Sequence, residues 1–421
     1  MKKILVWLML LALAVAGCAE TTDPAEQAAG AILQCFLNGD YETVADMLSD
    51  EVRASVGLEA LQSAWEQTAS MGALTGTELS MEQGFAVVSL AFERGSAQLV
   101  VGLNEDGRVT TLLLRPVVQQ TVERELPEGA SARTVVLFEG TERALNAELI
   151  VPAGECSTYA VLIHGSGPSN MDETVGGCKP FRDLAYDLAA SGVGSLRFDK
   201  ITYAHPELGA ETVTDEYLTP VQEALRVLKA ETGAARTVAI GHSEGGMLMP
   251  WLVTECGFDA GAALAGTPRT LWEISYAQNL AVLESMIGEQ RDAVAAQVEA
   301  ERARAENLDA LADDETLFGA PVKYQRSIAE LDEIALALKA DVPMLFLWGE
   351  ADFQVGREDF EAWQQGLSGS DKCAFISYPG LNHLFMPAQE GDSILNASAV
   401  YARAAQMDPQ VAADIAAWLA D

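Results

Sequence analysis

Short apolar runs alternate with amphipathic helical segments along the last three quarters of the chain. Eight runs have the length and composition of buried strands, at 134–138, 145–151, 159–163, 193–198, 237–240, 261–265, 344–348 and 374–378. Apolar positions at helical spacing lie between and after them, at 181–190, 216–231, 246–256, 354–365 and 408–420. Strands that alternate with helices favour a doubly wound, mostly parallel sheet. The pattern therefore predicts an α/β fold over residues 117–421.

Residues 267–340 interrupt this alternation with a long segment that has helical rather than strand spacing. An Ala- and charge-rich helical pattern covers 281–312, and a second helix is predicted near 327–338. Long insertions between core strands often carry function, for example as a lid over a site. We interpret the segment as a helical lid. The alternative is a solvated helical decoration.

The region before the α/β pattern, residues 25–116, has a different rhythm. Helical spacing dominates 25–73, and three strand-length runs follow at 85–90, 97–103 and 109–114, separated by hairpin-type turn sequences. Helices followed by an antiparallel meander make a small α+β domain. The region holds no histidine and no close cluster of catalytic residue types, so we expect a binding or spacer module.

The first residues indicate export. A basic start, an apolar run over 4–16 and small residues before Cys18 form a secretory signal, and the run is too short for a transmembrane helix. The Ala-Gly-Cys sequence resembles a bacterial lipobox, in which the cysteine receives lipid. We therefore expect a lipoprotein signal peptide at 1–17 and a tether at 18–24, with the protein anchored to the extracytoplasmic side of the membrane through Cys18. An ordinary signal peptide with an incidental cysteine is the alternative.

Charge and residue usage exclude several other classes of function. The chain has 26 Lys+Arg against 62 Asp+Glu, a net charge of −36, which disfavours nucleic-acid phosphates and a polybasic grip on anionic lipid. The cysteines after Cys18 are scattered without a CxxC pair, and the four histidines are dispersed. We therefore expect no metal centre and no cofactor.

The hexapeptide Gly-His-Ser-Glu-Gly-Gly at 241–246 follows a predicted strand and precedes a predicted helix. This is G-x-S-x-G in the strand–turn–helix context that a nucleophile elbow requires. A serine on so sharp a turn has strained dihedral angles, and flanking glycines let the backbones approach. The pattern predicts Ser243 as a nucleophile.

A serine nucleophile needs a general base and an acid that orients it. Of the four histidines, only His383 comes after the elbow, in a loop that follows the last predicted strand. We predict that it is the base; the alternative is a surface histidine. Asp352, after the strand at 344–348, is the best candidate for the acid. Glu350 is the second candidate and Asp199, at another strand end, a more distant one.

Acyl transfer also needs backbone donors for the oxyanion. The N–H of Glu244, directly after the nucleophile, is one expected donor. The His-Gly-Ser-Gly-Pro turn at 164–168 follows an earlier strand and offers the N–H of Ser166 as the second. The alternative for this second segment is a plain glycine turn.

Together these motifs resemble the α/β-hydrolase superfamily over residues 117–421. The closer resemblance is to bacterial secreted esterases that carry His-Gly-Ser-Gly-Pro, a downstream Asp172-Glu173-Thr174 and Gly-His-Ser-Glu-Gly-Gly. Residues 25–116 resemble the small domain of unknown function DUF3887 that often precedes such hydrolases. The resemblance implies the nucleophile, acid, base and oxyanion amides already assigned. The sequence departs from it after Asp199-Lys200, where Ile201-Thr202-Tyr203 replaces the usual Arg-Gly. In the family this loop usually shapes the pocket rim, so the resemblance leaves substrate size open.

The sequence thus predicts a serine carboxylesterase that cleaves small ester substrates through an acyl-enzyme. A peptidase, thioesterase or acyltransferase could use the same residues. An aminopeptidase would need an acidic grip on the substrate amine, which Asp172-Glu173 or the lid could provide. The alternative from another class is a surface-tethered binding protein with a non-catalytic hydrolase scaffold.

Overall fold

The computed structural model describes residues 23–286 and 288–420, which form two compact units. The first unit lies within 23–115, and the second is built chiefly from 116–420. The expected signal peptide and the lipidation candidate Cys18 lie outside the described residues. Within the described ranges, no helix has both the length and the apolarity that spanning a membrane requires.

The first unit combines helices with a four-stranded sheet in the order β1-β2-β3-β4. The helices are α1 (Pro24–Asn38), α2 (Tyr41–Met47), α3 (Asp50–Ser55) and α4 (Leu58–Ala69). The strands are β1 (Leu74–Glu82), β2 (Phe85–Phe92), β3 (Gly95–Leu103) and β4 (Val109–Pro116). Phe36 of α1 stacks on Trp65 of α4 with ring centroids 5.3 Å apart, and both side chains are buried.

Strand β1 is one that the apolar pattern did not indicate. Its residues are exposed almost throughout, so they show no alternation of buried and exposed positions. The strand is defined instead by antiparallel pairing with β2, in which Leu79 lies opposite Val88. Periodicity detects strands through burial, and it therefore missed this edge strand.

The second unit has the α/β-hydrolase fold, with an eight-stranded, mostly parallel sheet in the order β14-β13-β10-β9-β7-β8-β6-β5. Only β5 with β6 and β6 with β8 pair antiparallel. The strands are β5 (Ser131–Leu137), β6 (Leu145–Val151), β7 (Thr158–Ile163), β8 (Gly194–Phe198), β9 (Arg236–His242), β10 (Ala260–Leu264), β13 (Met344–Gly349) and β14 (Cys373–Tyr378). All eight overlap the runs predicted from the sequence.

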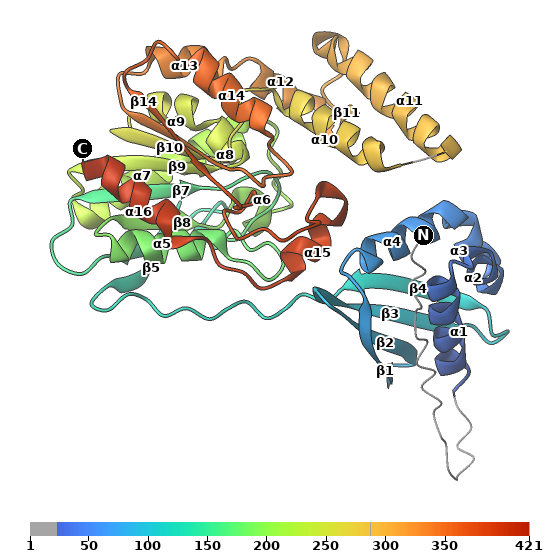
Figure 1. Cartoon of the computed structure of the whole chain (residues 1–421). Coiled ribbons are helices and arrows are strands. Elements are labelled where there is room, and N and C mark those ends of the chain that lie inside the picture. The colour runs from blue at the N-terminus through green and yellow to red at the C-terminus, as the bar shows by residue number, and fades with distance from the viewer. Residues whose placement is uncertain (1–22, 287, 421) are drawn as a thin grey trace, which may run out of the picture. The chain divides into compact units, whose positions relative to one another are not determined.

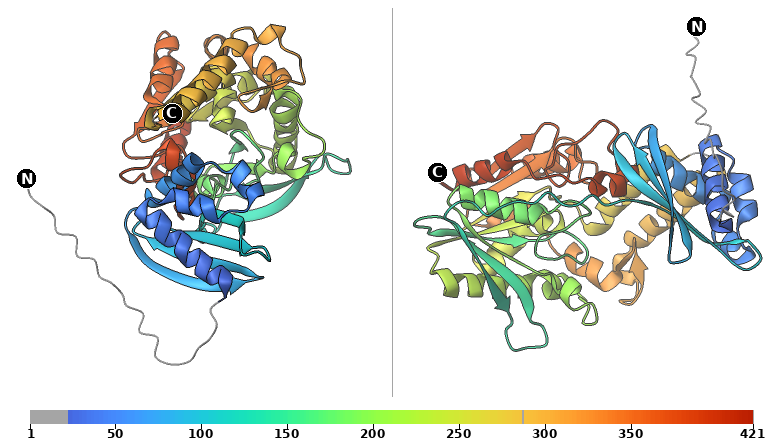
Figure 2. Two further views of the ribbon diagram at one scale, coloured as in Figure 1. Left: turned by 90° about the vertical axis from the view of Figure 1, so that its right-hand side faces the viewer. Right: turned by 90° about the horizontal axis from the view of Figure 1, so that it is seen from below.

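Helices cover both faces of this sheet (Figure 1; Figure 2 gives two further views). On β7, Ala160 and Leu162 pack toward one face with α5 (Pro180–Ala190) and α16 (Pro409–Ala420). Val161 and Ile163 point to the other face. The helices there are α7 (Thr219–Thr232), α8 (Glu244–Met247), α9 (Met249–Cys256) and α14 (Arg357–Gly366). Because both faces are covered, the central strands are continuously apolar.

The helix expected at 246–256 is two helices, α8 and α9, which meet at Leu248. Pro250 stands in the first turn of α9, where its missing N–H costs nothing. Shorter elements complete the unit: α6 (Ile201–Ala204), the π-helix η1 (Thr214–Leu218), the 3-10 turns η2 (Leu308–Ala310) and η3 (Ile394–Asn396), and α15 (Ala397–Ala402).

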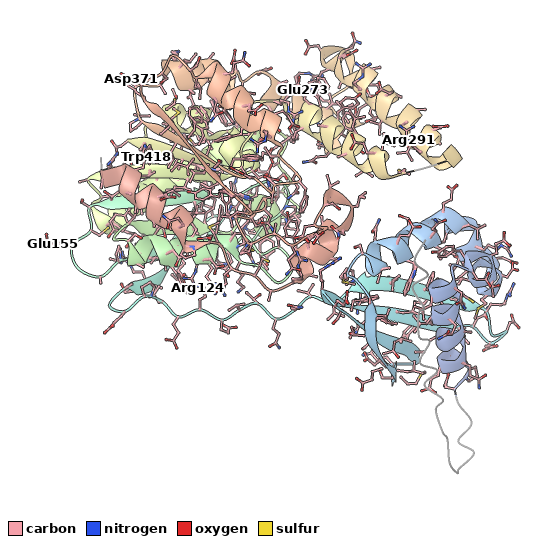
Figure 3. All side chains as sticks on the ribbon, in the orientation of Figure 1. Arg124, Glu155, Glu273, Arg291, Asp371 and Trp418 are labelled. Atoms are coloured by element: carbon pink, nitrogen blue, oxygen red, sulfur yellow. The ribbon has the colours of Figure 1, made fainter. Side chains whose placement is uncertain are left out.

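The insertion between β10 and β13 is largely helical, as expected. It contains α10 (Leu271–Ser285), α11 (Gly288–Ala305), the short strands β11 (Thr316–Leu317) and β12 (Ala320–Pro321), α12 (Val322–Ala329) and α13 (Glu333–Lys339). Helices α10 and α11 lie side by side (Figure 1). The first helix starts earlier than the sequence pattern suggested, at a capping box of Thr270 with Glu273. Figure 3 labels Glu273. A Thr-x-x-Glu pattern is a helix-start signal.

Candidate active site

Ser243 lies on the turn between β9 and α8 in a conformation that non-glycine residues rarely adopt, with φ 52° and ψ −114°. The turn is held by hydrogen bonds from the Ser243 N–H to the Leu264 carbonyl (2.8 Å) and from the Met247 N–H to the Ser243 carbonyl (2.8 Å). A Cβ on Gly241 would lie 2.1 Å from the Gly245 oxygen. Glycine is therefore required here by close approach, as the motif predicted.

His383 and Asp352 form a buried hydrogen-bonded pair. The Nδ1 atom of His383 lies 2.7 Å from Oδ2 of Asp352, and since a carboxylate only accepts, Nδ1 carries the hydrogen. The other carboxylate oxygen accepts the N–H groups of Gln354 (2.7 Å) and Val355 (3.0 Å), which fixes its orientation. Within the described part of the chain, Nε2 of His383 makes no hydrogen bond. That nitrogen is available to accept a proton.

The other two acid candidates are engaged elsewhere. Glu350 accepts the hydroxyl of Ser377 at 2.8 Å. Asp199 accepts the N–H of Met171 at 2.9 Å and the side-chain amide of Asn146 at 3.2 Å. Of the three carboxylates considered, Asp352 is the one that the structure brings to His383.

Ser243 and His383 share one cavity of about 160 Å³. Its other walls include Gly165, Ser166, Glu173, Gln354, Leu384 and Tyr401. Two larger cavities of about 520 and 570 Å³ lie in the insertion, and neither is lined by Ser243 or His383.

The two expected oxyanion residues both lie near Ser243. Glu244 is the first residue of α8, and Ser166 lines the cavity beside the serine. A Cβ on Gly165 would stand 3.1 Å from Cβ of Ser243, so the turn at 164–168 approaches the serine closely. Among the residues that the structure describes, none accepts the N–H of Ser166 or of Glu244.

A second histidine–carboxylate pair, which sequence reasoning missed, lies beside the first. His242 Nδ1 lies 3.1 Å from Oε1 of Glu173, and His242 Nε2 lies 2.9 Å from the carbonyl oxygen of His383. Glu173 also accepts the N–H of Gly165 at 2.7 Å. Only the Asp-Glu-Thr motif signalled Glu173, and it did not identify His242 as the partner.

Both members of this pair are buried. The shifts of their pKa values both favour a protonated His242 beside an ionised Glu173. Burial alone would lower the pKa of His242, but the Glu173 carboxylate, the His383 carbonyl and Asp352 together outweigh burial, and the pKa is raised. Burial alone would raise the pKa of Glu173, but charge and hydrogen bonding from His242 lower it. Because both ring nitrogens of His242 are engaged, this histidine cannot take a proton from Ser243.

The remaining histidines are structural. Burial lowers the pKa of His164 to about 4, so its ring is neutral, and Nε2 donates to the Asn170 carbonyl at 3.0 Å. His205 Nε2 lies 2.9 Å from the Ala144 carbonyl. In the ranges 23–286 and 288–420, no group of three or more His, Cys, Asp or Glu is placed to hold a metal.

The insertion is connected to the elbow through buried polar side chains. The Glu244 carboxylate accepts the hydroxyls of Tyr324 on α12 (2.9 Å) and Tyr217 on η1 (3.0 Å). Burial raises the pKa of this carboxyl. Gln278 on α10 also donates to the carbonyl of Gln354 at 3.0 Å, next to the cavity. The insertion therefore supports the residues around Ser243 on two sides.

Comparison with known proteins places these features in a family. The family model described as "Alpha/beta hydrolase family" matches residues 160–395. Esterase EstD of Thermotoga maritima is 30% identical over 404 residues, which cover 94% of this chain and 95% of that protein.

Solved structures of similar fold include Est1E from Butyrivibrio proteoclasticus, with 18% identity, 63% of this chain and 96% of that chain covered, and a TM-score of 0.44. They also include the esterase domain of a Rhodothermus marinus protein, with 18% identity, 68% and 97% covered, and a TM-score of 0.41. Two findings assign the chain to a family. The family model matches more than half of the chain, and Esterase EstD is similar over almost the full length of both chains. The chain belongs to the alpha/beta hydrolase family.

Proposed function

We propose that this protein is a serine carboxylesterase, with Ser243 as nucleophile, His383 as general base and Asp352 as the acid that orients it. The observation that carries the proposal is the buried Asp352–His383 pair, whose histidine lines the same small cavity as a serine on a strained elbow. The similarity to Esterase EstD over nearly the whole chain supports ester hydrolysis.

In the proposed reaction, Nε2 of His383 takes the proton of Ser243 as the serine oxygen attacks the ester carbonyl carbon. Asp352 stabilises the imidazolium that forms. The oxyanion accepts hydrogen bonds from the N–H groups of Ser166 and Glu244. The tetrahedral intermediate then expels the alcohol, which takes the proton from His383 and leaves an acyl-enzyme. Water repeats the sequence and releases the acid.

The cavity size favours short acyl groups. Pockets for drug-sized ligands have volumes of about 300 Å³ or more, whereas the cavity beside Ser243 measures about 160 Å³. We therefore expect acetate and butyrate esters to be better substrates than long-chain esters.

The acidic residues near the site do not favour a peptidase. Glu173 is paired with His242 and Gly165. Asp172 lies 3.1 Å from Lys179 and 3.2 Å from Arg197. A carboxylate that is already paired is a poor partner for a substrate amine, so ester cleavage is the better-supported function.

The test uses purified protein without residues 1–18. Wild-type protein should hydrolyse p-nitrophenyl acetate and butyrate, prefer them to the decanoate, and react with a fluorophosphonate at Ser243. Ser243→Ala should lose both reactions, while amino-acid anilides should be poor substrates. Absence of ester turnover together with absence of labelling would contradict the proposal.

We also propose that the protein is exported and anchored by lipid on Cys18. Metabolic labelling with a fatty acid in a bacterial host should mark the wild-type chain and not Cys18→Ser, and the labelled chain should sediment with membranes. Equal labelling of both chains would contradict the anchor, without bearing on the esterase proposal.

A further inference from the structure

The carbonyl of Gly165 is surrounded by buried hydrogen-bond donors. Nζ of Lys200 lies 2.8 Å from this oxygen, and the hydroxyl of Tyr217 lies 2.9 Å from it. Lys200 follows β8, Tyr217 stands on the π-helix η1, and both side chains are almost completely buried. Burying a lysine costs free energy unless its charge and its N–H donors are satisfied. The partners of Lys200 are therefore expected to be important for the structure around Gly165.

The Gly165 carbonyl belongs to the same planar peptide group as the N–H of Ser166. In a trans peptide the carbonyl and the N–H point in opposite directions, so fixing the oxygen fixes the direction of the N–H. The N–H of Gly165 is itself held by Glu173 at 2.7 Å. The turn is thus held by charged side chains on both sides of Gly165.

The donors of Lys200 are fully used. Besides the Gly165 oxygen, Nζ reaches the Tyr217 oxygen at 2.7 Å and Oε1 of Glu216 at 3.0 Å. An ammonium group has three N–H donors, which match these three acceptors. The single Tyr217 proton is shared between the Gly165 oxygen and Glu244. Lys200 is therefore the constant donor to the peptide and Tyr217 the secondary one.

We propose that Lys200, assisted by Tyr217, is a positioning residue of the oxyanion hole, which orients and polarises the Gly165–Ser166 peptide so that the Ser166 N–H is a stronger donor. A hydrogen bond from a charged donor is stronger than a neutral one, and it polarises the group that accepts it. Donors that are aligned in advance stabilise the oxyanion without reorganisation. The inference rests on the proposed esterase function.

The experiment compares Lys200→Met and Tyr217→Phe with a matched control, Tyr378→Phe. Tyr378 is buried and its hydroxyl also donates to a carboxylate, Oδ2 of Asp414 at 3.0 Å, but this pair is not part of the network around Gly165. For each variant we would measure kcat and KM for p-nitrophenyl butyrate. We would also measure the inhibition constant of an alkyl trifluoromethyl ketone, which forms a tetrahedral adduct with an oxyanion, and the Tm.

Outright removal of an oxyanion donor costs about 10²–10³ in kcat, so weakening one should cost less. We expect Lys200→Met to lower kcat about 30-fold and Tyr217→Phe about 5-fold, with KM within about twofold. The affinity for the ketone should fall by the same factors as kcat. Tyr378→Phe should keep kcat and the inhibition constant within about twofold, even if its Tm falls.

A folded Lys200→Met protein with kcat and ketone affinity within about twofold of wild type would overturn the inference. So would equal losses in Tyr378→Phe, because they would indicate that removing any buried tyrosine hydroxyl lowers activity through general destabilisation. If Lys200→Met does not fold, Tyr217→Phe decides by the same criteria. Failure of the esterase proposal is distinguishable, because wild-type protein would then show neither ester turnover nor labelling by the fluorophosphonate.

Discussion

Two histidine–carboxylate pairs lie side by side in this protein, and they differ in one nitrogen. The rings of His242 and His383 have centroids 4.8 Å apart, and each ring has one nitrogen against a buried carboxylate. Nε2 of His242 is tied to the His383 carbonyl, whereas Nε2 of His383 makes no hydrogen bond within the described residues. In the proposed mechanism, the free Nε2 of His383, and not its carboxylate partner alone, distinguishes the general base from the structural histidine His242.

The largest expected effect comes from the pair with the free nitrogen. His383→Ala should lower kcat by about 10⁴ or more, as should Ser243→Ala, because in the proposed mechanism each removes an atom that takes part in bond making or proton transfer. Steady-state ester hydrolysis measures both. If His383→Ala stayed active while His242→Ala lost activity, the assignment of the base would be reversed.

Asp352→Asn should lower kcat by about 10³–10⁴, because an amide can hold the wrong tautomer of His383. Glu350→Gln is the matched control, since Glu350 bonds to Ser377 and not to His383. The control should keep kcat within about threefold. Comparable losses in the two variants would argue against Asp352 as the orienting acid.

The second pair should matter more for stability than for chemistry. Glu173→Gln leaves His242 without its anionic partner, and breaking a buried pair costs about 3–5 kcal/mol of unfolding free energy. We expect kcat to fall only about tenfold, through loss of support for the Gly165 turn and for the His383 loop. Urea unfolding monitored by circular dichroism, together with ester kinetics, measures the two effects. A loss of activity as large as that of His383→Ala would place Glu173 in the chemistry itself.

The smallest effect is a pH dependence of stability. The lowered pKa of Glu173 stabilises the fold above its ordinary value of 4.5, and this contribution is lost as acid protonates the carboxylate. The raised pKa of His242 stabilises the fold below its ordinary value of 6.5, and this contribution is lost as the pH rises through the raised pKa. The difference in unfolding free energy between wild type and Glu173→Gln should therefore be largest at about pH 4.5–6.5. A difference that stays flat from acid to alkaline pH would contradict the charged pair.

The sequence was sufficient to predict the parallel sheet and to nominate Ser243, Asp352 and His383. Buried parallel strands leave continuous apolar runs, and the three residues follow strand ends that meet at one edge of the sheet. Chain order and one motif were therefore enough to select Asp352 and His383, which are hydrogen-bonded in the structure. Their catalytic roles are a proposal.

Glu173 and Lys200 could not be assigned in this way, for a physical reason. Their partners come from other loops: His242 lies 69 residues beyond Glu173, and the Gly165 carbonyl lies 35 residues before Lys200. A pairing of this kind depends on which strands are neighbours, here β7, β8 and β9. The strand β1 escaped detection for the opposite reason, because its exposed residues carry no burial pattern.

The central claim is that Ser243 carries the acyl group while Nε2 of His383 moves its proton. The direct measurement is mass spectrometry of the protein after acid quench during turnover of p-nitrophenyl acetate, followed by peptide mapping. The proposed mechanism predicts one acetyl group on the peptide that contains Ser243, and none in Ser243→Ala. An enzyme that hydrolyses the ester with its acetyl group on another residue would contradict it.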